Sequence, residues 1–263
     1  MILRSNNTHA AEAGHWYTTD GSPCYEVEAA QGGMRPTTLR DARKLNLVPG
    51  VTTIIRMAAA PGLENWKAEQ LLLAGLTLPR RPDELEAAWL DRVRQDSREQ
   101  ARKAAERGTA LHASLQGHFE GIPPPVEHFK HVHGAVLAIN RWLDVKISPP
   151  WIAEQSFAHT LGFGGKCDLR NPNRVIDFKT KEFTIDLPKT WFEHAMQLAA
   201  YRHGFGMGAA RCAICFVSVT EPGLAHLVEI DEDDLTRGWQ CFRALLEFWQ
   251  AKNRYKSAFN VCQ

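Results

Sequence analysis

The stretch GGKCDLRNPNRVIDFKTKEF, residues 164–183, places two aspartates and a lysine within a dozen residues of one another. Two short runs flank the Asn-Pro-Asn segment at 171–173, a pattern that predicts two strands joined by a turn. Asp177 and Lys179 are two residues apart, so their side chains leave the same face of one strand. Because the turn pairs this strand with the one that carries Asp168, both carboxylates and the ammonium are expected at one edge of a sheet.

The neighbours of Asp177 indicate how deeply this strand is buried. Val175 shares the face of Asp177, whereas Ile176 and Phe178 point to the opposite face. A surface hairpin with a cross-strand salt bridge is the alternative, and such a pair adds little stability. The run VIDF nevertheless reads as a buried strand, where unpaired carboxylates are costly.

Two carboxylates at close range repel each other, and a hard divalent cation between them removes that conflict. Mg²⁺ is usually held by one or two carboxylates together with substrate phosphate oxygens, which Asp168 and Asp177 could supply. The backbone carbonyl of Phe178 is a third candidate ligand. Lys179 could hold or help to deprotonate an attacking water and counter charge in the transition state. Glu154, on the preceding strand, could add a carboxylate at the same edge.

Size and composition indicate an ordinary globular protein. The 263 residues suit one large domain or a core with an appendage. No apolar run reaches the length of a bilayer span, so no membrane association is expected. The chain starts without the apolar stretch of a secretory signal, which predicts a cytoplasmic protein. Because the net charge is only +1, a polyanion must be held by a local basic groove.

Strand patterns dominate the C-terminal half. A helix is expected between the third and fourth strands, with Gly204 as its stop, and a final helix follows the acidic cluster at 231–234. The expected strands cover 151–157, 163–169, 174–180, 211–219 and 224–230, and the expected helices cover 126–143 and 188–204.

The N-terminal third is expected to be a hairpin and helical appendage. Asp20-Gly21 predicts a hairpin turn within residues 14–28. A short polar helix is expected at 37–46, and a helix that starts after Pro61-Gly62 should end at Gly75. The charged segment 82–107 suits an exposed helix, and a new helix should start at Gly108-Thr109.

Arg94, Arg98 and Arg102 repeat every four residues and form one stripe on the charged helix. This stripe is either a solvated face or a ridge that follows the phosphates of a nucleic acid. Three tryptophans could stack on bases, although core packing is the other interpretation for each. They are Trp66, Trp89 and Trp191.

Histidine and cysteine clusters elsewhere do not have the spacing of metal sites. Of the three histidines at 128, 131 and 133, only His128 and His131 share a helix face, and no cysteine is close in sequence. Cys212 and Cys215 lie three apart in a strand-like run and so point to opposite faces, while the cysteines at 24, 241 and 262 are scattered. An iron–sulfur cluster is therefore not expected.

The order of these features resembles the PD-(D/E)xK nuclease superfamily, in its RecB-like exonuclease branch. Asp168 precedes the IDFK run of Asp177 and Lys179, and a later helix carries Gln197 and Tyr201 in HAMQLAAY. GTALH at 108–112 is similar to the upstream histidine helix of that branch. VPGVTTII and LENWK resemble the lead-in of phage and mitochondrial single-strand exonucleases. No proline precedes Asp168, where Cys167 stands instead, a departure that this branch commonly shows.

The resemblance implies roles for individual residues. His112 would ligate or orient a metal, Asp168 and Asp177 would bind Mg²⁺ or Mn²⁺, and Lys179 would be the catalytic lysine. Gln197 and Tyr201, one helical turn apart, would contact DNA or brace the active site. The implied setting is the cytoplasm of a bacterial or phage-infected cell, in DNA repair or recombination, with phage or host recombination proteins as partners. The oligomeric state is not specified.

The expected fold is α/β, a restriction-endonuclease-like core with a mixed sheet flanked by helices and an N-terminal helical and hairpin extension. Residues 1–107 would form part of a DNA groove, and 108–263 would form the nuclease core. The expected activity is a metal-dependent deoxyribonuclease that acts as an exonuclease on single-stranded or duplex ends. A structure-specific endonuclease on the same core and an inactive DNA-end binding module are the alternatives.

Overall fold

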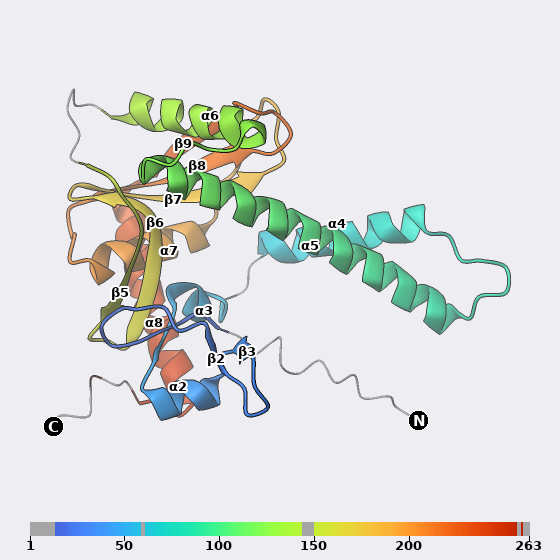
Figure 1. The fold of residues 1–263 in the computed structure, drawn as a ribbon, viewed down its shortest axis with the longest axis horizontal. Helices are drawn as coiled ribbons and strands as arrows, with labels where there is room; N and C mark the ends of the chain where they lie inside the picture. Colours follow the sequence, from blue (N-terminus) through green and yellow to red (C-terminus); the bar gives the residue numbers. More distant parts are fainter. Residues whose placement is uncertain (1–13, 59–60, 144–149, 257–258, 260–263) are drawn as a thin grey trace.

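A five-stranded mixed sheet forms the centre of the molecule (Figure 1). The computed structural model describes residues 14–58, 61–143, 150–256 and 259. The strand order is β5-β6-β7-β8-β9; β7 and β8 run parallel, and every other neighbouring pair is antiparallel. The prediction of an α/β fold with a mixed sheet is confirmed. The strands span Ile152–His159, Phe163–Asn171, Arg174–Lys181, Arg211–Ser218 and Ala225–Ile230.

Helices cover both faces of this sheet (Figure 1). On one face lie α5 (Glu86–Phe119) and α6 (Val126–Trp142), and on the other lie α7 (Phe192–Gly204) and α8 (Glu232–Lys252). Because parallel strands cannot be joined by a tight turn, α7 makes the crossover between β7 and β8. The sheet is therefore the middle of three layers.

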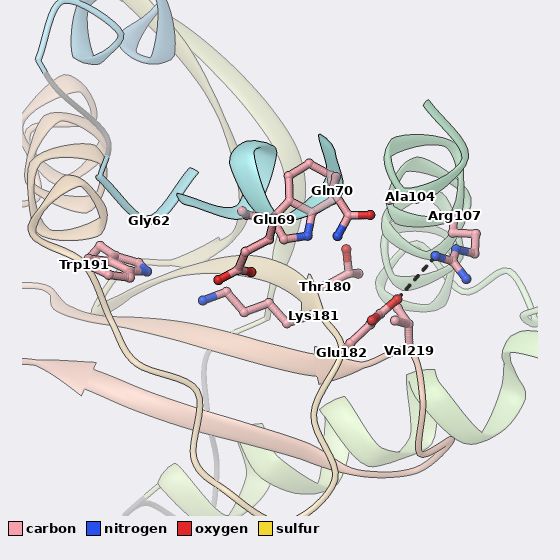
Figure 2. A pocket seen from close by; sticks show the side chains of 11 residues that line it. Gly62, Glu69, Gln70, Ala104, Arg107, Thr180, Lys181, Glu182, Trp191 and Val219 are labelled. Atoms are coloured by element: carbon pink, nitrogen blue, oxygen red, sulfur yellow. Dashed lines mark ion pairs between the residues drawn. The ribbon is translucent and has the colours of Figure 1, made fainter. Parts of the chain in front are cut away.

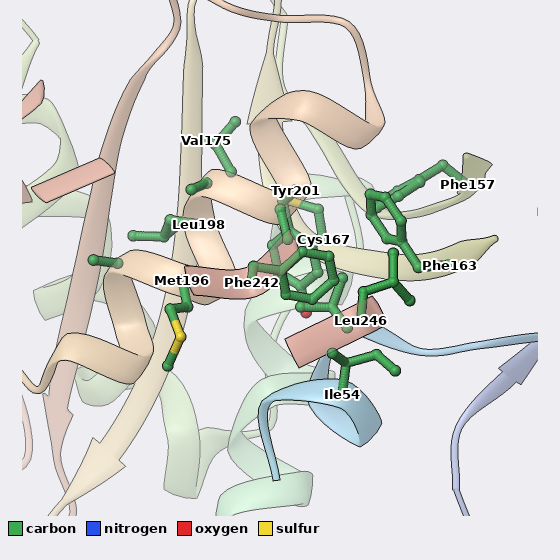
Figure 3. Close-up of a cluster of buried hydrophobic side chains, with 14 of the residues drawn as sticks. Ile54, Phe157, Phe163, Cys167, Val175, Met196, Leu198, Tyr201, Phe242 and Leu246 are labelled. Carbon is green, nitrogen blue, oxygen red and sulfur yellow. The ribbon is translucent and has the colours of Figure 1, made fainter. Parts of the chain in front are cut away.

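Each face of the sheet buries its own hydrophobic cluster, and β7 contributes to both. Val175 packs in the cluster under α7 and α8 (Figure 3), whereas Ile176 and Phe178 pack in the cluster under α5 and α6. The predicted alternation along β7 is confirmed. A strand buried on both faces in this way carries a continuous apolar run. Asp177, only 2% exposed, interrupts that run.

The N-terminal segment differs from the predicted hairpin. The turn at Asp20-Gly21 forms, with Gly21 at φ 90°. The residues on its two sides, however, form only a single β-bridge, between Tyr17 and Pro23. β1 (Trp16–Tyr17) pairs instead with β4 (Val48–Pro49). Trp16 is 1% exposed within the cluster under α7 and α8, so long-range packing decides the strand partner rather than the local turn.

The remaining N-terminal elements are short. Thr38 caps α2 (Leu39–Leu45) through a capping box with Asp41, which confirms the helix expected at 37–46. The segment after Gly50 forms α3 (Val51–Ile55), and Val51 and Ile54 are buried against the core. The second hairpin consists of β2 (Glu26–Glu28) and β3 (Met34–Pro36).

A pair of antiparallel helices, α4 (Pro61–Thr77) and α5, projects from the body (Figure 1). The predicted restart at Gly108 is wrong, because α5 is one continuous helix of 34 residues. A glycine inside a helix costs only about 0.5–1 kcal/mol relative to alanine, too little to end one that is packed on a sheet. The division expected at residue 107 falls inside this helix.

Two helix ends also differ from prediction. α4 continues through Gly75 to Thr77, whose hydroxyl donates to the carbonyl of Leu73 at 2.9 Å. α7 begins at Phe192, four residues after Pro188, because residues 182–191 form an irregular connection with bends at 184–186. The final helix begins as predicted, with the Asp231 carboxylate accepting from the Asp234 amide at 2.7 Å.

Within the described ranges, no helix combines the length and the apolar character needed to cross a bilayer.

Candidate functional site

The two aspartates meet where β6 and β7 separate. Leu169 pairs with Ile176 and Arg170 with Val175, so Asp168 stands opposite Asp177 in the same register. The Asp168 carboxylate enters the gap between the strands, and its Oδ2 accepts from the backbone N–H of Phe178 at 2.7 Å.

This hydrogen bond also orients the backbone of Phe178. In an extended strand, the N–H and C=O of one residue leave on the same edge. The Phe178 carbonyl therefore faces the same gap as the Asp168 carboxylate.

Lys179 and Gln197 surround the second carboxylate. Lys179 Nζ lies 2.5 Å from Asp177 Oδ2 and 3.3 Å from Gln197 Oε1. Gln197 Nε2 donates to Asp177 Oδ1 at 2.8 Å and lies 2.9 Å from the Tyr201 hydroxyl. The helical spacing of Gln197 and Tyr201 on α7 thus produces a continuous chain of contacts from Tyr201 to Lys179.

Burial differs among these four side chains. Asp177, Tyr201 and Gln197 are 2%, 4% and 8% exposed, whereas the Lys179 side chain is 31% exposed. Only the lysine of this set reaches solvent appreciably. Gln197 and Tyr201 lie behind the carboxylates, in a position to brace them, and a ligand that approached from solvent would meet Lys179 before it met either.

His112 approaches from the opposite layer. The C-terminal half of α5 brings its Nδ1 to 3.6 Å from Asp168 Oδ2, and its ring meets the Phe178 ring edge-on at 6.2 Å between centroids. Burial lowers the pKa of His112, more strongly than the nearby Asp177 raises it. A neutral imidazole is the form that can coordinate a metal or accept a hydrogen bond.

The charges of this cluster conflict. Burial raises the pKa of Asp168 well above its usual range, and the charge of Asp177 raises it further. Burial lowers the pKa of Lys179, but the charges of the Asp177 and Asp168 carboxylates outweigh this effect, so the pKa of Lys179 is raised. A single ammonium therefore serves two carboxylates, and additional positive charge would relieve the repulsion between them.

Glu154 lies beside this cluster but is already paired. On β5 it stands opposite Asp168, between the pairs Ala153–Leu169 and Gln155–Cys167. Its backbone adopts a left-handed φ of 51°, and its carboxylate forms an ion pair with Lys166. The negative charge of Glu154 contributes to the raised pKa of Asp168.

The arginine stripe lies away from the carboxylates, on the projecting half of α5 (Figure 1). At 1.5 Å per residue, Arg102 is about 15 Å along the helix axis from His112, and Arg94 is about 27 Å away. Arg94 pairs with Asp91 at 3.2 Å, and Arg102 pairs with Glu99 at 2.6 Å and with Glu106. Arg94 and Arg98 border a shallow groove, also lined by Asp91 and Gln95.

His128, Cys212 and Cys215 occupy packed positions. His128 Nδ1 lies 2.7 Å from the Ser114 hydroxyl, between α6 and α5. Cys212 and Cys215 are fully buried in β8, in the hydrophobic clusters on opposite faces of the sheet. Cys241 is exposed on α8, and Cys262 lies outside the described residues.

Among residues 14–58, 61–143 and 150–256, no three histidine, cysteine, aspartate or glutamate side chains are grouped as a metal site. The candidate site therefore rests on two carboxylates. A donor set of two carboxylates fits Mg²⁺, which keeps several waters and takes further oxygens from a substrate phosphate. It does not fit a structural zinc site, which needs four nitrogen or sulfur ligands.

A pocket lies near the end of β7, beyond Lys179, and its composition could not be foreseen from sequence. Thr180 and Lys181, which follow Lys179 on β7, line it together with Gln70 of α4 and Arg107 of α5 (Figure 2). Only the fold brings α4 next to the end of β7. The sole signal in the sequence is the pair Trp66 and Trp191, which also lines this pocket.

No protein-family model matches the chain, and no curated protein matches it. Among solved structures, the chain is similar to a candidate exonuclease from Eubacterium rectale, at 12% identity and a TM-score of 0.40, over 57% of this chain and 68% of the other. A protein named SSO0001 matches at 20% identity and a TM-score of 0.25, over 50% of this chain and 68% of the other. Similarities this low identify no activity.

Proposed function

We propose that this protein is a metal-dependent deoxyribonuclease that hydrolyses phosphodiester bonds from a DNA end. The observation that carries the proposal is the meeting of Asp168, Asp177 and Lys179 at the point where β6 and β7 separate, with Gln197 behind them. Two largely buried carboxylates beside one partly exposed ammonium suit phosphoryl chemistry, whereas a purely structural ion pair would need only one carboxylate. The exonuclease specificity rests on the resemblance of the motifs.

The residues have distinct roles in this proposal. Asp168, Asp177 and the Phe178 carbonyl would hold Mg²⁺ or Mn²⁺, with His112 beside Asp168 as a further ligand or an orienting group. The metal would polarise the scissile phosphate and lower the pKa of a bound water.

The chain itself supplies positioning and charge. Lys179, the most exposed member of the cluster, presents its ammonium to the negative charge that develops on the phosphate. Gln197 holds both Asp177 and Lys179, so the two side chains keep their separation when substrate binds. The Phe178 N–H fixes one Asp168 oxygen and leaves the other free to bind.

A time course on end-labelled single- and double-stranded DNA with Mg²⁺ or Mn²⁺ tests this proposal. We expect the wild type to shorten linear DNA, and Lys179→Ala to lose cutting while it retains DNA binding. Lys44→Ala is the matched control, because Lys44 is exposed on α2. Absence of cutting by the wild type with either metal, or full activity of Lys179→Ala, would contradict it.

A circular single strand separates the nuclease alternatives. An obligate exonuclease leaves the circle intact, whereas an endonuclease on the same core linearises it. A DNA-end binding module without activity would bind the linear strand and cut neither substrate. Loss of cutting in Asp177→Ala and on addition of a chelator would exclude this last alternative.

A further inference from the structure

The pocket beyond Lys179 is large enough for a small ligand and begins at Thr180, the residue that follows Lys179 on β7. Its volume is about 670 Å³, within the range of roughly 300–1,000 Å³ typical of ligand sites. A strand rises about 3.3 Å per residue, so Thr180 and Lys181, which line the pocket, lie about 3 and 7 Å beyond Lys179 along β7. Thr180 is three residues beyond Asp177, about 10 Å along the strand, so a ligand group in this pocket would lie about that far from one held at Asp168 and Asp177.

Besides β7, several other parts of the chain build the walls (Figure 2). α4 supplies Trp66, Glu69 and Gln70, α5 supplies Arg107, and the segment before α7 supplies Trp191. Trp66 and Trp191 are 125 positions apart in the sequence, so the two indoles come from distant segments of the chain. Their side chains are only partly buried and present aromatic surface to the pocket.

A close approach of α4 positions Trp191. A Cβ built on Gly62 would lie 2.7 Å from two indole carbons of Trp191, so a side chain there would displace the ring. The ammonium of Lys189, an exposed residue, lies 4.7 Å from the centroid of the Trp191 ring. Gly62 thus leaves Trp191 in place as a wall of the pocket.

The charges of the pocket balance, which argues against a phosphate as its occupant. Arg107 forms an ion pair with Glu182 at 3.5 Å, and Lys181 and Glu69 add one further charge of each sign. Phosphate sites need an excess of positive charge or a set of convergent backbone N–H groups. Partly exposed indoles with amide, hydroxyl and carboxylate groups around them suit a flat heteroaromatic ring with hydrogen-bonding edges.

We propose that this pocket binds the base of the nucleotide next to the scissile phosphate in a single strand of DNA. The base stacks on Trp66, with Trp191 as a second aromatic wall of the pocket, and Gln70, Glu69 and Thr180 face its polar edge. The inference rests on the proposed nuclease function, which places the scissile phosphate at Asp168 and Asp177. It further implies that a duplex must fray at its end, because a stacked and paired base cannot enter the pocket.

The test compares Trp66→Leu and Trp66→Phe with the wild type on single-stranded oligonucleotides that carry one abasic nucleotide at successive positions from each end. Loss of base stacking costs roughly 5- to 100-fold. We therefore expect Trp66→Leu to lower kcat/KM by that factor, mostly through KM, and Trp66→Phe to lose much less. An abasic nucleotide at one position should lower kcat/KM of the wild type by a similar factor. At that position it should not lower kcat/KM of Trp66→Leu any further.

Leu72→Ala is the control on the same helix, because Leu72 is 67% exposed and does not line the pocket. The inference is overturned if Trp66→Leu cuts within twofold of the wild type, or if no abasic position affects the two proteins differently. Affinity for the oligonucleotides is also measured by anisotropy in a chelator, where no cutting is needed. If the wild type cuts nothing, the proposed function fails. The anisotropy data then still test the pocket, because the inference requires that Trp66→Leu weaken the affinity for DNA that carries all its bases.

Discussion

Gln197 joins three of the side chains that define the candidate site. Its amide nitrogen reaches Asp177 and Tyr201, and its amide oxygen reaches Lys179. No other described residue contacts both members of the Asp177–Lys179 pair through hydrogen bonds. Partners that orient metal ligands in this way are typically worth 10- to 100-fold in metal affinity or activity.

We expect Gln197→Ala to lower the cutting rate by about 10- to 100-fold, because Asp177 and Lys179 lose their common partner. Steady-state cleavage of labelled DNA measures the effect, with circular dichroism to check the fold. Tyr201→Phe is the comparison variant, since it removes only one hydrogen bond to Gln197 and should cost less. A Gln197→Ala protein that cuts at the wild-type rate would contradict the bracing role.

His194 gives a pH-dependent contribution to stability. Its Nδ1 accepts from the Trp191 amide at 3.2 Å, and burial, together with the charge of Lys179, lowers its pKa from 6.5 to about 4. The unfolded chain therefore binds a proton at a higher pH than the folded one. The stabilisation is complete above about pH 6.5 and is lost as the pH falls toward 4.

We expect His194→Gln to flatten the decline in the free energy of unfolding between pH 6.5 and pH 4, because glutamine keeps an acceptor and does not titrate. Urea unfolding at several pH values measures it. His133→Gln, at an exposed position of α6, is the control and should leave the decline unchanged. A decline that is as steep in His194→Gln as in the wild type would show that another group causes it.

The sequence could predict the convergence of Asp168, Asp177 and Lys179 because strand alternation and one short turn determine it. It could not predict that Glu154 pairs with Lys166, because the pair depends on the left-handed backbone conformation of Glu154 itself inside β5. Nor could it place the Trp66 pocket, since the packing of α4 near β7 is a long-range contact.

At the scale of elements, α7 and α8 cross at an unusually close contact. A Cβ built on Gly238 of α8 would lie 2.8 Å from the backbone of Ala195 on α7, and backbone cannot move aside cheaply. The glycine therefore sets the distance between the two helices. Gly75 of α4 is its opposite, because a Cβ added there would have no atom of another part of the described chain within 4 Å.

We expect Gly238→Ala to lower the free energy of unfolding by about 1–3 kcal/mol, because it overpacks the helix crossing. Gly75→Ala should raise it by about 0.5–1 kcal/mol, since alanine favours a helix and meets nothing there. Chemical unfolding of both variants beside the wild type measures the difference. Equal effects of the two substitutions would contradict the proposed close crossing.

The elements that sequence predicted well are those with strong local signals. β6 alternates between buried and partly buried residues, β7 is a short apolar run, and a turn joins them. α8 has an acidic start and a buried face with Leu235, Phe242 and Trp249. The elements that it missed depend on distant partners. β1 pairs with β4 because Trp16 packs in the core, and α5 runs through Gly108 because both halves rest on other helices or on the sheet.

At the scale of the whole molecule, the projecting α4–α5 pair extends the surface that leads to the candidate site (Figure 1). Arg94 and Arg102 are already paired with acidic neighbours, so they have little charge to offer a phosphate. Among the ion pairs found in the described ranges, none involves Arg98, which is exposed. If this surface follows DNA, Arg98 is the member of the stripe that contributes most.

We expect Arg98→Gln to reduce the slope of log Kd against log salt concentration by about 0.7, the value for one phosphate contact on a single strand, and Arg102→Gln to reduce it less. Fluorescence anisotropy with a labelled single strand at several salt concentrations measures both slopes. The same slope for wild type and Arg98→Gln would identify the stripe as a solvated face that does not touch DNA.

The central claim is that Asp168 and Asp177 share one divalent cation. Its most direct test is anomalous scattering from crystals soaked in Mn²⁺. The account predicts a peak within coordination distance, about 2.0–2.2 Å, of an oxygen of each carboxylate. A fully soaked crystal without a peak there, or a peak bound by only one of the two aspartates, would contradict it.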